Sequence, residues 1–240
     1  FSVLVDVVRY RRFKRFTLDT RLVLVTSIAL WILGTVVFFT FEMRNAATMQ
    51  DLPISSQVVN SFFQSVSGRT AGFSTVDFGS THQSTNFFYG ALMFIGGASG
   101  STAGGIKVNT LAVLVAAVVA SLRGRPSAEA FGRGIAHVQV YRALSVILLA
   151  VLATFGVAVI LAFVEPFTFI DLLFESISAF ATNGLATGIT SQLSAVGQLI
   201  LVITMFVGRL GPLTLGLLLA QREEKPRAIY QYSEERVKIG

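Results

Sequence analysis

One pattern occurs twice along this chain, and it constrains the fold more than any other feature. Each copy is an apolar run, a short amphipathic run, a Thr-x-Gly turn and a glycine-interrupted apolar run. The matched segments are Phe63-Gln64-Ser65-Val66-Ser67 with Phe174-Glu175-Ser176-Ile177-Ser178, Thr70-Ala71-Gly72-Phe73 with Thr182-Asn183-Gly184-Leu185, and Met93-Phe94-Ile95-Gly96 with Met205-Phe206-Val207-Gly208. The match needs one inserted residue, near Phe180. Two such units predict two walls of a pore.

The composition places the chain in a lipid bilayer. Apolar residues make up 53% of it and charged residues only 13%, with a mean hydropathy of +0.69. Such a chain lacks the charged surface of a soluble domain. Residues 22–41 and 143–164 carry no formal charge, and each run is long enough to cross about 30 Å of hydrocarbon as a helix. The sequence therefore predicts an all-α membrane protein.

The distribution of basic residues predicts the orientation of the chain. The chain has a net charge of +6, and most of its lysines and arginines lie in three blocks, at residues 9–21, 107–142 and 222–238. The positive-inside rule then places both ends and the middle loop in the cytoplasm, with the two turns toward the outside. Topology and contact with anionic membrane lipids explain these charges better than nucleic acid does. The absence of cysteine excludes disulfides and thiol-bound metal.

Between the long runs lie segments too short to cross. Residues 58–68 and 169–180 reach about 17 Å each as helices, so they must enter the membrane and turn back. Non-helical backbone at that depth must face water or protein, and the negative end of each short helix favours cations there. We expect a filter of backbone carbonyls at these turns. Its candidate residues are Thr70, Ala71, Gly72, Phe73, Thr182, Asn183, Gly184 and Leu185.

The apolar stretch after the first turn, residues 85–122, has one formal charge, at Lys107, and is too long for a single span. It must break where helix-forming residues are fewest. These residues are Gly96, Gly97, Ala98, Ser99, Gly100, Ser101, Thr102, Ala103, Gly104 and Gly105. A flexible plug beneath the turn is the favoured interpretation, and close helix packing through small residues is the alternative.

Two arginines stand in otherwise apolar surroundings. Arg209 occupies the position in the second copy that corresponds to the glycine run, and we expect it to face a cavity or the carbonyls of that run. The alternative is that its side chain reaches the cytoplasmic surface. Arg69 is predicted to support the filter by pairing with Asp77, Glu175 or a neighbouring carbonyl.

These residues carry a resemblance to a known family. Ser67-Gly68-Arg69-Thr70-Ala71-Gly72-Phe73, Phe180-Ala181-Thr182-Asn183-Gly184-Leu185 and the intervening Gly100-Ser101-Thr102-Ala103-Gly104-Gly105-Ile106-Lys107 resemble the Trk/Ktr/HKT superfamily of potassium transporters. The ending, residues 232–240, is similar to that of the Ktr-type membrane subunit. The family has four repeats of helix, pore loop and helix around one pore, and this chain matches the third and fourth.

The resemblance implies uptake of potassium, bound at Thr70, Gly72, Thr182 and Gly184, with residues 96–105 and Arg209 as the gate. The implied partners are a missing N-terminal half, a second copy of the subunit, membrane lipids and a cytosolic nucleotide-binding RCK ring. The implied location is the bacterial inner membrane, with no cofactor; stimulation by sodium stays open. Asn183 departs from the family pattern, in which valine is common, and this departure leaves the details of ion selectivity open.

The expected organisation has five parts. They are a cytoplasmic link (1–21), a pore repeat with a broken second helix (22–122), a cytoplasmic loop (123–141), a second pore repeat (142–220) and a cytoplasmic tail (221–240). Because the chain opens at Phe1 on a cytoplasmic stretch, we expect a fragment of a longer protein.

Other functions fit the residues less well. A coupled secondary cation transporter is the main alternative, because broken helices at the membrane centre are typical of that class. Gly97-Ala98-Ser99-Gly100 matches an intramembrane serine protease motif, but His82 and His137 lie at other depths and cannot act as the base. A membrane scaffold subunit leaves the repeated turns unexplained.

Overall fold

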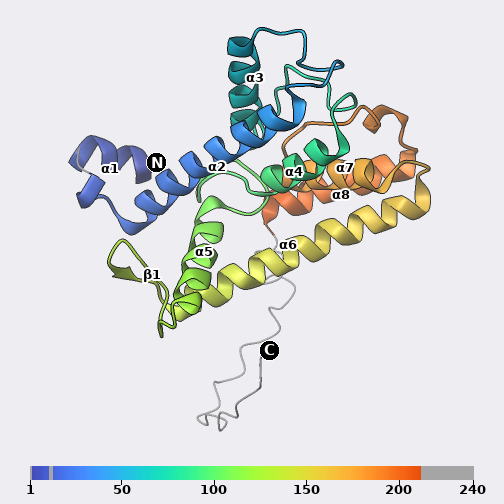
Figure 1. The fold of residues 1–240 in the computed structure, drawn as a ribbon. Helices are drawn as coiled ribbons and strands as arrows, with labels where there is room; N and C mark the ends of the chain where they lie inside the picture. The colour runs from blue at the N-terminus through green and yellow to red at the C-terminus, as the bar shows by residue number, and fades with distance from the viewer. Residues whose placement is uncertain (1, 11–12, 212–240) are drawn as a thin grey trace, which may run out of the picture.

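The computed structural model describes residues 2–10 and 13–211, and it is helical over most of this length (Figure 1). The predicted cytoplasmic tail, 221–240, lies outside the described residues. The elements in chain order are α1 (Ser2–Tyr10), η1 (Phe13–Arg15), α2 (Leu18–Glu42), α3 (Ile54–Ser67), α4 (Gln83–Phe94), α5 (Val108–Leu122), β1 (Glu129–Ala130), β2 (Arg133–Gly134), α6 (His137–Val164), α7 (Phe169–Ala181), η2 (Thr190–Gln192) and α8 (Ala195–Leu210).

Helices α2 and α6 are the long helices of Figure 1, and both are long and apolar enough to cross a membrane. Each begins before the uncharged run that predicted it, because a helix continues readily into the polar residues that flank an apolar stretch. At the start of α2, Thr17 caps the helix by accepting a hydrogen bond from Thr20 N (3.3 Å). The two predicted spans are therefore present as helices.

The predicted cytoplasmic link and loop contain structure that the sequence did not reveal. The link holds α1, and Asp6 ties it to the start of α2 by accepting hydrogen bonds from Thr17 N (2.9 Å) and Thr17 Oγ1 (2.7 Å). The hydrogen bond from the Thr17 backbone is the main cause that lowers the pKa of Asp6. The loop forms a short antiparallel hairpin, β1 with β2, which is a small exception to the all-α prediction.

The order of elements repeats along the chain. The first repeat runs from α2 through the short α3 to α4 and α5, and the second runs from α6 through the short α7 to α8. Helix α4 ends at Phe94 and α5 begins at Val108. The long apolar stretch is thus interrupted where the glycines predicted a break.

Aromatic side chains join the two repeats. A buried cluster contains Phe38, Phe78 and Tyr89 of the first repeat and Phe174 of α7. The ring centroids of Phe78 and Phe174 lie 5.4 Å apart. Helix α4 also packs along α7, so the two repeats form one body over the described residues.

A buried carboxylate closes each repeat at the end of its long helix. Glu42, at the end of α2, accepts a hydrogen bond from the backbone N–H of His82 (3.0 Å), the N-cap residue of α4. Glu165, after the end of α6, accepts from the backbone N–H of Ser194 (3.0 Å), the N-cap residue of α8. Each carboxylate therefore fixes where the returning helix begins, and it is favoured there by the helix dipole.

Glycine in α2 permits close packing of the first repeat, and a substitution tests this. A Cβ on Gly34 would overlap the Ser65 hydroxyl of α3 and lie 2.9 Å from Leu92 Cδ2 of α4. We expect Gly34→Leu in the full-length protein to lower the melting temperature in detergent by several degrees, because overpacking costs about 1–3 kcal/mol.

The matched control is Gly156→Leu in α6, the other long helix, where a Cβ meets nothing within 4 Å. This variant should melt at or above the temperature of the unsubstituted protein, because leucine forms helix better than glycine. Equal melting temperatures for the two variants would contradict the packing at Gly34.

Candidate functional site

The two Thr-x-Gly turns adopt the same unusual backbone. Thr70 and Gly72 have φ of 67° and 77°, and Thr182 and Gly184 have φ of 52° and 91°. Among the described non-glycine residues, positive φ occurs at these two threonines and at one other position, Phe131. A β-branched residue avoids this region. Such strain persists only where the surroundings enforce it, and it gathers at functional sites.

The short helices hold the two turns by equivalent hydrogen bonds. At the end of α3, Ser67 O accepts from Ala71 N (3.0 Å), the middle residue of the first turn. At the end of α7, Ser178 O accepts from Asn183 N (2.9 Å), the middle residue of the second. The sequence repeat is therefore also a repeat of backbone contacts, with the inserted residue absorbed at the end of α7.

One buried polar side chain on each short helix fixes the segment that follows its turn. Gln64 of α3 is fully buried, and the amide orientation that satisfies its neighbours lets Oε1 accept from Thr75 N (3.1 Å) and Val76 N (3.2 Å). Glu175 of α7 has an exposed fraction of 4% and accepts from Thr187 N (3.0 Å). Its other oxygen accepts from Thr190 Oγ1 (2.7 Å). The two side chains occupy matching positions of the repeat.

The two turns lie against each other. A Cβ on Gly72 would overlap the backbone oxygen of Asn183, so this glycine is required by close approach as well as by its φ. The side chain of Asn183 is buried, and neither of its polar atoms has a hydrogen-bond partner among the described residues.

The glycine-rich loop, residues 95–107, contacts the second turn and the residue that precedes the first turn. Arg69, before the first turn, donates from Nη2 to Gly96 O (2.7 Å). Thr182, in the second turn, accepts at Oγ1 from Gly104 N (3.1 Å). Arg209 of α8 donates to Thr102 O, and Lys107 donates to Ala103 O within the loop itself. The loop is thus held from both repeats.

The loop has a buried stem and an exposed tip. Its stem is closed by hydrogen bonds from Gly96 N to Ile106 O (2.8 Å) and from Val108 N to Gly97 O (3.1 Å). Residues 99–102 are exposed. Loop carbonyls receive the hydrogen bonds from Arg69, Lys107 and Arg209, so cationic side chains replace the pairing that a helix would have given this backbone.

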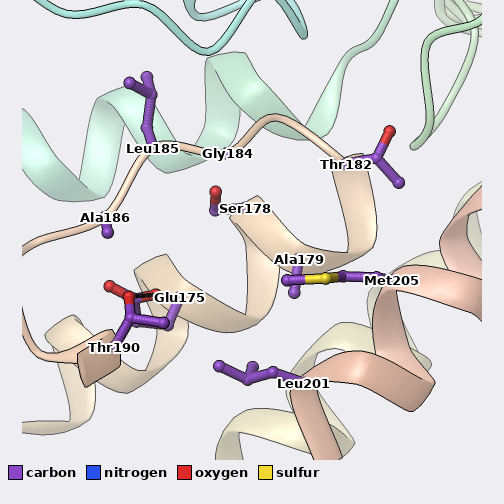
Figure 2. A pocket seen from close by; sticks show the side chains of 10 residues that line it. All are labelled: Glu175, Ser178, Ala179, Thr182, Gly184, Leu185, Ala186, Thr190, Leu201 and Met205. Atoms are coloured by element: carbon purple, nitrogen blue, oxygen red, sulfur yellow. Dashed lines mark hydrogen bonds between the residues drawn. The ribbon is translucent and has the colours of Figure 1, made fainter. Parts of the chain in front are cut away.

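A cavity of about 260 Å³ lies beside the second turn, between α7, α8 and the segment that follows the turn (Figure 2). Oxygen-bearing side chains of Glu175, Ser178, Thr182 and Thr190 line it, together with apolar side chains that include Leu201 and Met205 of α8. The cavity places a carboxylate and the second turn along the same space.

Most of the predicted residues are brought together, and Arg69 has one of the partners that the sequence left open. Of the three partners predicted for Arg69, the structure gives a carbonyl, that of Gly96, and the ion pairs with Asp77 and Glu175 are not formed. Asp77 is exposed and accepts from Gly79 N (3.0 Å) in its own turn. The contact of Arg209 with the loop is one of the alternatives that the sequence left open.

Sequence reasoning missed the partners that hold the loop and turns from behind. Gln64 was not singled out, although it stands at the repeat position of Glu175 and that match was visible. Asn109 accepts at Oδ1 from Ser99 N (3.1 Å) in the loop tip and donates to Asp19 of α2. No local sequence pattern marks this contact, because it depends on where α2 and α5 meet.

Comparison with known proteins gives one consistent result. The family model described as "TrkH: Cation transport protein" matches residues 3–229. The Ktr system potassium uptake protein B of Bacillus subtilis is 39% identical over 224 residues, which cover 93% of this chain and 50% of the relative. The protein of the same name from Vibrio alginolyticus is 37% identical over 242 residues, covering 100% and 52%.

A solved structure agrees in fold. The potassium transporter TrkH from Vibrio parahaemolyticus superposes with a TM-score of 0.70 at 20% identity, covering 91% of this chain and 48% of that one. The chain therefore spans about half the length of the relatives it matches. Taken with its two repeated turns, the match over residues 3–229 shows that this chain belongs to the TrkH family of cation transport proteins, a family of membrane transporters and not of enzymes.

Proposed function

We propose that this chain forms two of the four walls of a potassium pathway in a bacterial plasma membrane, as part of a Ktr-like uptake system. One observation carries the proposal: two turns with the same positive-φ threonine and glycine lie against each other at the ends of two short helices. The names of the relatives, which are potassium uptake proteins, support the choice of ion.

The turns have the conformation that a carbonyl filter needs. Residues of positive φ alternate with a residue of ordinary φ in Thr70-Ala71-Gly72 and in Thr182-Asn183-Gly184, and this alternation can direct successive carbonyls to one side of the chain. Carbonyls in such a row replace the water around a potassium ion. The carboxyl ends of α3 and α7 point toward the same turns and favour a cation there.

The glycine-rich loop is the proposed gate. It contacts the second turn through Thr182, and hydrogen bonds from Arg69, which precedes the first turn, and from Arg209 hold it there. A loop held by a few such contacts can move away when they are exchanged for water, whereas a continuous helix cannot. The positive charge of Arg209 close to the path would also repel cations while the loop is in place.

One proposed partner is suggested by the length of this chain relative to its relatives. The other two walls would come from the half of the protein that this chain lacks, as its coverage of about 50% of its relatives suggests. A second copy of the subunit and a cytosolic nucleotide-binding RCK ring complete the proposed assembly. The exposed basic loop before α6, which includes Arg123, Arg125 and Arg133, offers a surface for the ring or for anionic lipids.

The filter assignment predicts loss of ion selectivity on substitution of its glycines. In the full-length protein, Gly72→Ala and Gly184→Ala should each reduce the preference for potassium over sodium by about tenfold or more, because a Cβ at positive φ distorts the carbonyl row. Gly72→Ala should be the more severe, since its Cβ also overlaps Asn183 O. Rubidium uptake with sodium competition measures this.

Gly188→Ala is the matched control, because Gly188 has a φ of 92° and open space around it but lies outside the turn. It should keep the ion preference while suffering the same backbone strain. Unchanged selectivity in both turn variants would contradict the proposal that the two turns form the ion filter.

If the loop is the gate, a substitution that weakens its contacts should change the rate of transport and leave the ion selectivity unchanged. Arg209→Gln removes a cation that binds the loop, so potassium flux in the absence of the partner ring should rise about threefold or more while the potassium-to-sodium preference stays the same. Flux into proteoliposomes that contain the full-length protein measures both quantities. A variant with unchanged flux and full dependence on the ring would mean that this contact is packing and not gating.

A further inference from the structure

Glu175 and Gln64 perform the same structural task but differ by one charge. Both are buried, both lie on the short helix of their repeat, and both accept hydrogen bonds from backbone N–H groups just after the turn. An amide oxygen is sufficient for this task in the first repeat. The hydrogen bonds to the backbone therefore do not by themselves require a carboxylate in the second, where the other oxygen also accepts from Thr190 Oγ1.

The charge of Glu175 has no cationic partner among the described residues. Arg125 forms an ion pair with Glu129, in the hairpin region. The polar neighbours of Glu175 are the uncharged Thr187 and Thr190, and Asp171 lies one helical turn earlier with a charge of the same sign. A buried carboxylate without a counter-charge is unfavourable, so a positive charge from elsewhere would stabilise it.

The cavity shown in Figure 2 connects this carboxylate with the second turn. Glu175, Thr182 and Gly184 line the same space of about 260 Å³. The carboxylate and the turn thus share one small, partly open cavity lined by protein. Electrostatic attraction across such a region is weakened less than it is in solvent.

We propose that Glu175 is an affinity-determining residue of the pore: its carboxylate gives the second turn a fixed negative charge that the first turn lacks, and the cation in the filter is its counter-charge. This inference rests on the proposed potassium pathway. The two residues divide the work, because hydrogen bonding keeps the backbone of each turn in place while the charge of Glu175 raises the occupancy of the filter by a cation.

The proposal predicts that loss of the charge raises the KM for the transported ion and leaves the preference between ions unchanged. Glu175→Gln keeps the size of the side chain and one accepting oxygen, replaces the oxygen that accepts from Thr190 by an NH2 group that can donate to the same hydroxyl, and removes the charge. In the full-length protein, the KM for rubidium uptake should rise about tenfold, as expected for a unit charge acting over roughly 10 Å at an effective dielectric constant of about 20. The preference for potassium over sodium should stay within about twofold, because the backbone cage is unchanged.

The reciprocal substitution supplies the decisive comparison. Gln64→Glu should lower the KM, and the double variant Gln64→Glu with Glu175→Gln should bring the KM back to within about threefold of the original, because it restores one charge at an equivalent position. A merely structural role for Glu175 would not allow rescue from the other repeat. Asp171→Asn is the matched control on the same helix; it removes a half-exposed charge farther from the turn and should leave the KM within about twofold.

Each outcome bears on the inference separately from the proposed function. If the unsubstituted protein takes up rubidium and Glu175→Gln has the same KM, the inference is wrong and the pathway stands. A raised KM that Gln64→Glu does not restore shows that Glu175 acts through its hydrogen bonds and also overturns the inference. If Glu175→Gln does not accumulate in the membrane, Gln64→Glu decides alone: a lower KM supports the inference and an unchanged KM refutes it. Absence of uptake by the unsubstituted protein contradicts the proposed function itself.

Discussion

Backbone that leaves the helical form inside a membrane must find its hydrogen bonds within the protein or in a water-filled space, and this constraint governs the structure. The chain leaves the helical form at both turns and in the glycine-rich loop. Gln64 and Glu175 supply acceptors behind the turns, and Arg69 supplies a donor to the loop. Polar side chains such as those of Gln64, Glu175 and Arg69 therefore hold the chain where the helices stop.

The helices, breaks and turns could be predicted from the sequence because each depends on local composition. Long uncharged runs predicted α2 and α6, and a run of glycines predicted the break that follows α4 at Phe94. The sequence did not reveal that Glu42 accepts from His82, forty positions later. It also left three partners open for Arg69. Contacts of this kind depend on the three-dimensional arrangement of the repeats, and neither periodicity nor spacing encodes it.

The two repeats differ where the pathway is proposed to be controlled. In the first, the loop of residues 95–107 separates α4 from α5, and in the second, α8 runs as far as Leu210 in the part of the chain that the structure describes. Arg209 of α8 binds the loop that results from the break, so the irregularity of one repeat is matched by a charge in the other. In the proposed pathway the two repeats therefore have different tasks: the first supplies the loop, and the second supplies a side chain that holds it.

The anchoring of the loop to both repeats has a mechanical consequence. Arg69 belongs to one wall, whereas Thr182 and Arg209 belong to the other, and all three bind the same loop. A displacement of the walls away from each other cannot keep all of these hydrogen bonds at their lengths. In the proposed pathway, widening the protein at this depth and releasing the loop would therefore be one motion rather than two.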